Sequence, residues 1–357
     1  MKYSIESIIC FLLFLVCLEA SGQTKKLDSL RNLNPKSKQE KIGQALALAD
    51  YYSEGEHENL DSLRFYANKA SGLNKRENEK LHIDVLCLLS NVEIGDRNYE
   101  KALKLSEDVI SKSSEIGYNL GLRKGNTLLG NLYFLKDELL KSAFYYEKAY
   151  QLAKSNKEDL NTVLTAALDL NDKFIRLGEF VKAEALLEKM AVFIEDPSVS
   201  KKIKCYYYYD VAQILAELGK PEKSLEKYHK SLKIAQEMDD ELMHFTILSN
   251  IANVYTSRRN YPESLKYDLM ALELVRISTE ATPYSKGNIF YRVGRDYYGL
   301  NQYSKAVHFL NNGLEAFGSS EEDPPAYAEI LKFLGYSYRK LNQEQKAADK
   351  LEEAKNL

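Results

Sequence analysis

Small residues recur through this chain at a nearly constant spacing of 40 to 42 residues. Such regularity over eight copies is hard to obtain by chance, so it indicates that one structural unit is repeated along the chain. We use these small residues as anchors, one for each copy. The anchors are Ala49, Ser90, Gly130, Asn171, Ala212, Ala252, Gly294 and Gly335.

Each copy has the pattern of two helices that pack on each other. A second small residue lies twelve positions after the anchor in the last seven copies, namely Ala102, Ser142, Ala183, Ser224, Ser264, Ala306 and Ala347. Two helices can approach closely only where small residues lie, so we expect both small positions in the contact between paired helices. Glycine (17) and proline (7) are scarce and few stretches alternate in polarity, which indicates an all-α chain.

The third copy carries this pattern in its fullest form. It reads Leu129-Gly130-x2-Tyr133, a polar turn at 136–138, Ser142-x3-Tyr146 and then Ala149. This resembles the tetratricopeptide repeat, whose signature is L-G-x2-Y followed by A-x3-F and a small residue. The resemblance extends over residues 38–357, with a period of about 41 residues where the standard repeat has about 34. Repeats of roughly this length occur in kinesin light chains.

The resemblance implies both a fold and an arrangement of helices. The expected fold is an all-α, right-handed superhelical solenoid of about eight antiparallel helix pairs that occupies residues 41–357. In such a fold each repeat contacts mainly its neighbours, and the first helices line a concave groove. Residues 23–40, with leucines at a spacing of three, are expected to form an N-terminal capping helix and a linker.

The first 22 residues have a different pattern. Lys2 is followed by an apolar run from Ile8 to Leu18, and small residues precede Gln23. This pattern predicts a secretory signal peptide that is cleaved after Gly22, with an uncleaved membrane anchor as the alternative. No later segment contains eighteen consecutive apolar residues, so we expect a soluble mature chain in the periplasm or outside the cell, without stable membrane insertion.

Composition and motifs argue against several functions. A formal net charge of −3 does not favour a nucleic-acid binder, which needs a basic surface to neutralise phosphates. The five histidines are scattered without the spacing of metal ligands, and the chain contains no GxSxG, no HExxH and no phosphate-binding glycine loop. We therefore expect a non-enzymatic protein with no cofactor, no metal site and no nucleic-acid partner.

The residue after each anchor is expected to face the groove that the resemblance implies. Seven of these eight residues are polar or charged. Asn91, Asn131 and Asn253 resemble the asparagine ladder of peptide-binding family members, because a side-chain amide can both donate to and accept from a peptide backbone. The alternative is that asparagine is simply tolerated on a solvated face.

The last two repeats combine cationic and aromatic side chains at positions that should face the groove. These residues are Arg292, Arg295, Lys332, Tyr336 and Arg339. Cations pair with carboxylates and tyrosine supplies a stiff apolar surface, so this end is expected to bind acidic or carboxylate-bearing segments. The alternative is a solvated face with ordinary helix charges. The lysine and asparagine set of the carboxylate clamp found in some family members is absent, so recognition of a C-terminal carboxylate is not predicted.

Two functions follow from these observations. The main hypothesis is an exported scaffold that holds a protein or peptide in its groove, and the cations of the last two repeats favour an acidic one. The alternative is the ligand-sensing part of a bacterial signalling system whose kinase or transcription-regulator output is on a separate or truncated chain. This alternative needs a second chain because the sequence ends at Leu357, at the end of the eighth repeat.

Overall fold

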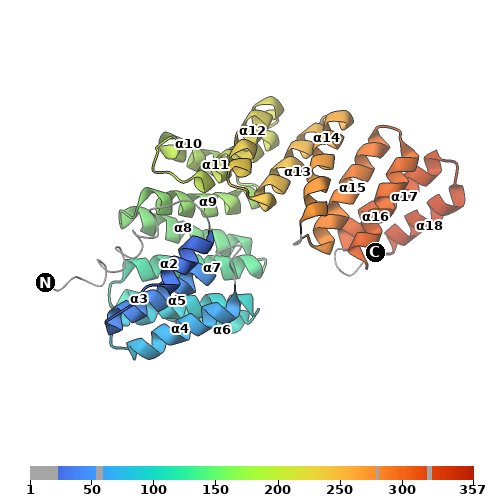
Figure 1. The fold of residues 1–357 in the computed structure, drawn as a ribbon. Coiled ribbons are helices and arrows are strands. Elements are labelled where there is room, and N and C mark those ends of the chain that lie inside the picture. The colour runs from blue at the N-terminus through green and yellow to red at the C-terminus, as the bar shows by residue number, and fades with distance from the viewer. Residues whose placement is uncertain (1–22, 54–58, 279–280, 320–323) are drawn as a thin grey trace. The chain divides into compact units, whose positions relative to one another are not determined.

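The computed structural model describes residues 23–357 apart from 54–58, 279–280 and 320–323. The predicted signal peptide, residues 1–22, therefore lies outside the described residues. The described residues form seventeen α-helices and contain no strand (Figure 1). In this part of the chain, no helix is both long enough and apolar enough to cross a membrane.

Sixteen of the helices follow the repeat, and a short helix, α2 (Gln23–Arg31), precedes them. The first helices of the eight repeats are α3 (Lys38–Tyr52), α5 (Glu79–Gly95), α7 (Asn119–Leu135), α9 (Leu160–Arg176), α11 (Lys201–Glu217), α13 (Glu241–Ser257), α15 (Pro283–Gly299) and α17 (Pro324–Lys340). The second helices are α4 (Leu60–Asn74), α6 (Tyr99–Glu115), α8 (Leu139–Ser155), α10 (Phe180–Ile194), α12 (Pro221–Glu237), α14 (Tyr261–Ile277), α16 (Tyr303–Phe317) and α18 (Glu344–Lys355). The prediction of an all-α chain with two helices in each repeat is confirmed.

The first helix ends in the same way in the last seven repeats. The residue seven positions after each anchor has a positive φ between 57° and 71°, and these residues are Arg97, Asp137, Gly178, Gly219, Arg259, Asn301 and Asn342. In the third repeat the N–H of Glu138 then donates to the carbonyl of Tyr133 at 2.8 Å, and the same bond recurs in the other six of these seven repeats. This left-handed C-cap stops the first helix and turns the chain back within a few residues.

The small residues lie where paired helices touch, as the sequence predicted. A Cβ atom added to Gly130 would lie 2.8 Å from Cδ2 of Tyr146 on the second helix of the same repeat. Gly294 and Gly335 are equally close to leucine side chains of α16 and α18. The hydroxyl of Ser142 donates to the carbonyl of Gly130 at 2.8 Å, so the twelve-residue spacing corresponds to a hydrogen bond between the paired helices.

The chain divides into two compact units, one up to Lys182 and one from Ala183 onward. In the first unit consecutive helices pack together from α2 to α9, and in the second they do so from α11 to α18. First helices of adjacent repeats also contact each other, namely α3 with α5, α5 with α7 and α15 with α17. Residues on α15 and α17 therefore share one surface of the second unit, which we call the first-helix face.

Candidate functional site

Arg292, one of the predicted binding residues, is held inside the second unit by a network of hydrogen bonds. Only 7% of its surface is exposed. Its Nε donates to Oδ1 of Asp268 on α14 at 2.8 Å, and its Nη1 donates to Oδ1 of Asn253 on α13 at 2.8 Å. Its Nη2 donates to the carbonyl of Ser249 at 2.5 Å. Arg292 thus joins α13, α14 and α15, and its charge is matched by the fully buried carboxylate of Asp268.

Arg295 lies beside this network and faces a second buried acid. Its Nη2 donates to Oγ1 of Thr256 at 2.9 Å and lies 3.7 Å from Oδ1 of Asp296 and 3.9 Å from Oδ2 of Asp268. Neither carboxylate oxygen of Asp296 has a hydrogen-bond partner in the part of the chain that the structure describes. Burial and the nearby carboxylate of Asp268 raise the pKa of Asp296 to about 7. The carboxyl of Asp296 therefore keeps its proton to a higher pH than an ordinary aspartate does.

We expect the second unit to lose stability as the pH rises toward 7. An aspartate in an unfolded chain has a pKa of about 4, whereas folded Asp296 has a pKa of about 7. Between these values only the folded state holds the proton, so the stabilisation that is complete below pH 4 is lost as the pH rises through 7. The charged groups that act on Asp296 are Asp268, Arg295 and Arg292, and the hydroxyl of Ser264 also lies beside it.

The variant Asp296→Asn tests this expectation because an amide of the same shape cannot ionise. Its melting temperature should change less than that of the parent between pH 5 and pH 8, and it should exceed that of the parent at pH 8. A pKa difference of one unit corresponds to about 1.4 kcal/mol. Asp349→Asn, a change of an exposed acid on α18, is the matched control. Equal pH dependence of the parent and Asp296→Asn would disprove the expectation.

An aromatic cluster covers the first-helix face next to this network. It consists of Tyr291 and Tyr298 on α15 and Phe333 and Tyr336 on α17. Phe333 is the centre, with ring centroids 5.8 Å from Tyr291, 5.5 Å from Tyr298 and 6.1 Å from Tyr336. Tyr336 is the most open member, with 40% of its surface exposed. The guanidinium of Arg295 lies over the Tyr291 ring, 5.9 Å from its centroid.

The two cations that the sequence placed on α17 differ in their surroundings. Lys332 pairs with Glu329 one turn earlier, at 2.7 Å, and both side chains are about half exposed. Arg339 is exposed, and its guanidinium has no hydrogen-bond or ion-pair partner among the described residues. Of the five predicted residues in the last two repeats, Tyr336 and Arg339 are therefore the most accessible to a ligand.

The three asparagines of the predicted ladder lie in different surroundings. Asn91 on α5 and Asn131 on α7 belong to the first unit, and Asn253 on α13 belongs to the second. The hydroxyl of Tyr146 donates to Oδ1 of Asn131, while Oδ1 of Asn253 accepts from Arg292. Asn91 is half-buried and makes no side-chain hydrogen bond within the described part of the chain. The acceptor oxygens of Asn131 and Asn253 are thus already used within the fold.

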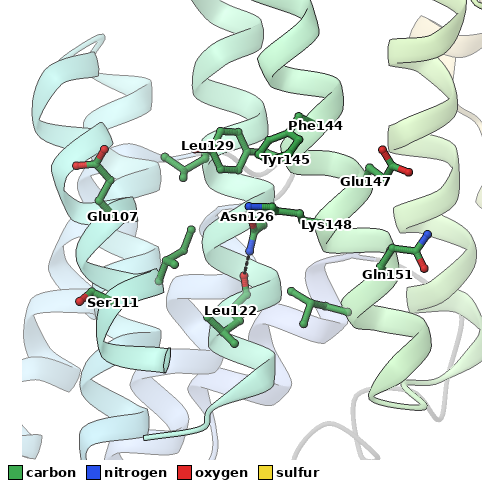
Figure 2. A pocket seen from close by; sticks show the side chains of 12 residues that line it. Glu107, Ser111, Leu122, Asn126, Leu129, Phe144, Tyr145, Glu147, Lys148 and Gln151 are labelled. Atoms are coloured by element: carbon green, nitrogen blue, oxygen red, sulfur yellow. Dashed lines mark hydrogen bonds between the residues drawn. The ribbon is translucent and has the colours of Figure 1, made fainter. Parts of the chain in front are cut away.

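A groove of about 780 Å³ lies in the first unit, and none of its lining residues is among the predicted binding residues. Figure 2 shows its floor on α7, with Leu122, Asn126 and Leu129, and its walls on α6 and α8. We call it the α6–α8 groove. No sequence pattern indicated it, because it depends on how far apart two second helices lie.

Comparison with known proteins identifies the repeat. Residues 245–277, in α13 and α14, match the family model described as "Tetratricopeptide repeat". The human protein called tetratricopeptide repeat protein 29 is 26% identical over 259 residues, which are 63% of this chain and 52% of that protein. The chain therefore spans about half the length of this curated relative.

Two solved structures share the fold over nearly the whole chain. The apo form of the quorum sensor NprR from B. thuringiensis has a TM-score of 0.70 at 10% identity, with 99% of this chain and 98% of that chain covered. The apo form of RapI has a TM-score of 0.63 at 13% identity, with 99% and 97% covered. These likenesses support the predicted solenoid of helix pairs.

Proposed function

We propose that this chain, whose helix pairs are similar to tetratricopeptide repeats, is a non-enzymatic binding protein that holds a peptide or protein segment against the first-helix face of its second unit. The observation that carries this proposal is the aromatic cluster on α15 and α17, in which Tyr336 is the most exposed ring. Tyrosine in such a cluster gives a rigid contact surface at small entropic cost, which is typical of binding hot spots.

The charges around the cluster favour an acidic ligand. The guanidinium of Arg339 is exposed and without a partner in the described residues, so a ligand carboxylate could pair with it at no cost to an existing ion pair. Lys332 could also bind a ligand carboxylate, which would replace its exposed ion-pair partner Glu329. Arg292 and Arg295 are not part of the proposed contact surface, because their guanidinium groups already donate hydrogen bonds to Asp268 and Thr256. Their role is to stabilise the packing of the helices that carry this face.

We place this activity outside the cytoplasm, in the periplasm or beyond the cell. The support is the sequence of residues 1–22, with Lys2, the apolar run and the small residues before Gln23. Sequencing the N-terminus of the protein expressed in bacteria would test this part. A mature protein that begins at Gln23 agrees with it, and an intact Met1 in a membrane fraction contradicts it.

The proposed site can be tested by selecting peptides that bind the protein consisting of residues 23–357. A random peptide library displayed on phage should yield binders enriched in Asp and Glu. Their affinity should fall about tenfold or more for the double variant Tyr336→Ala with Arg339→Glu, which removes one hot-spot aromatic and one charge partner. Both residues are exposed, so the fold should remain intact. The binding should also weaken with salt, since exposed charges are screened.

Lys233→Glu is the matched control for the charge change, because Lys233 is exposed on α12, a second helix of the same unit. Its binders should retain the affinity of the parent. Peptides that bind the double variant as tightly as the parent would place the site elsewhere. A library that yields no binder specific for the parent would contradict the proposal altogether.

Sensing of a ligand is the second candidate function, and the whole-chain likeness to the quorum sensor NprR favours it. A sensor must bind its ligand more tightly in one conformation than in another, so ligand binding changes the structure away from the site. Hydrogen exchange with a selected peptide separates the two functions. A scaffold should show protection at the site alone, and a sensor should also show altered exchange in distant helices.

A further inference from the structure

The α6–α8 groove is bounded by one stripe of side chains from each of its three helices. Leu122, Asn126 and Leu129 follow one another on α7 at spacings of four and three residues. Phe144, Lys148 and Gln151 line the groove on α8 with the same spacing, and Lys148 reaches across it toward α7 (Figure 2). Spacings of three and four residues mark the side of a helix that packs against another helix.

The dimensions of the α6–α8 groove fit one further helix. The stripe from Phe144 to Gln151 extends along about 10 Å of α8, which is about two helical turns. The floor is apolar at both ends, since Leu122 and Leu129 flank the largely buried Asn126. The Phe144 ring stands on the wall with 52% of its surface exposed, which is a large aromatic surface in contact with water.

The chain's own packing keeps the floor of the groove rigid. A Cβ atom added to Gly125 on α7 would lie 2.7 Å from Cγ1 of Ile110, so α6 packs tightly against α7 beneath the groove. The amide nitrogen of Asn126 donates to the carbonyl of Leu122 at 2.7 Å, which fixes that side chain on the floor. A preformed surface of this kind loses little conformational entropy when a partner binds.

Charge decides which kind of helix the groove would accept. Three charged residues line it, and Glu107 and Glu147 stand at its two edges in Figure 2. Lys148 instead reaches across the groove toward Asn126, with its Nζ 4.3 Å from the centroid of the Phe144 ring. The charge at the centre of the groove is therefore positive and lies over an apolar floor.

We propose that the α6–α8 groove is the docking site for an amphipathic helix of a partner protein. The helix would place apolar side chains, spaced three and four residues apart, on Leu122 and on the Phe144 ring, above the buried Leu129. An Asp or Glu beside that stripe would pair with Lys148, above the floor. This site is separate from the first-helix face of the second unit, so the chain would hold two partners by different surfaces.

Two fluorescein-labelled helical peptides of about sixteen residues would test the proposal. Both carry a leucine stripe, and one has glutamates beside the stripe where the other has lysines. By fluorescence anisotropy the parent should bind the glutamate peptide about tenfold more tightly than the lysine peptide. Lys148→Glu should reverse this preference, because it changes the sign of the charge at the centre of the groove.

Phe144→Ala should weaken the binding of both peptides about tenfold, because it removes an apolar wall. Leu140→Ala is the matched control, since Leu140 lies on the same helix, is 75% exposed and does not line the groove. Tyr336→Ala should leave both affinities unchanged, which separates this site from the first-helix face. The proposal is overturned if the parent binds neither peptide, if Lys148→Glu keeps the preference of the parent, or if Leu140→Ala acts like Phe144→Ala.

Discussion

Replacement of Arg292 by alanine should destabilise the second unit by about 3–5 kcal/mol, because the fully buried carboxylate of Asp268 would lose the closer of its two ion-pair partners and keep only Arg295, at 3.9 Å. The guanidinium also carries the hydrogen bonds that link α15 to Asn253 and to the carbonyl of Ser249 on α13. Urea unfolding followed by circular dichroism would measure the change. A repeat protein can unfold in steps, so the transition of the second unit should be followed separately.

Two further variants make this prediction specific to the buried pair. Arg339→Ala removes an exposed arginine from the next first helix and should change the stability by less than about 0.5 kcal/mol. The double variant Arg292→Met with Asp268→Asn replaces both charges of the pair by neutral side chains. It should therefore be more stable than Arg292→Ala, which leaves the Asp268 carboxylate without its closest cation. If Arg292→Ala is as mild as Arg339→Ala, the buried network does not hold these helices together.

Gly130→Leu should destabilise the first unit by about 3 kcal/mol or more, at the upper end of the usual cost of overpacking. Even a Cβ atom there would lie 2.8 Å from the Tyr146 ring. That ring cannot easily turn away, because it is buried and its hydroxyl donates to Asn131. The measurement is the unfolding midpoint in urea.

Gly72→Leu is the matched control for Gly130→Leu. Gly72 also lies within a helix, α4, but an added Cβ atom there would meet nothing within 4 Å. Since glycine weakens a helix by about 0.5–1 kcal/mol relative to residues such as alanine, this variant should be neutral or stabilising. Equal midpoints for the two variants would mean that the anchors do not lie at the helix contacts.

The fold was predictable because the small residues of each repeat mark, in the sequence, the positions where paired helices touch. A small residue every 40 to 42 positions is what closely packed helix pairs require, and Gly130, Gly294 and Gly335 all lie against the paired helix. The left-handed turn was harder to read. Gly178 and Gly219 show it by residue type, and asparagine at 301 and 342 is a weaker signal, whereas Arg97 and Arg259 adopt the same positive φ with no such signal.

The candidate site was less predictable, because residue type does not tell whether a charge is already paired. Arg292 was expected on the surface, but its partner Asp268 lies 24 residues earlier on another helix. A signal did exist, because Asp268 follows Ser264 by four residues and precedes Ala271 by three, along the buried stripe of α14. A carboxylate in that stripe needs either a buried cation or a proton to neutralise it. Phe333 was missed for a similar reason, since its role depends on the contact between α15 and α17.

Hydrogen exchange of the chain with and without a selected acidic peptide tests the central claim most directly, because it locates the ligand without altering the protein. The proposed site predicts slower exchange in Pro283–Gly299 and Pro324–Lys340, the two helices that carry the aromatic cluster. This protection should be absent in the double variant Tyr336→Ala with Arg339→Glu. A bound peptide that leaves exchange in both helices unchanged and protects residues elsewhere would contradict the account.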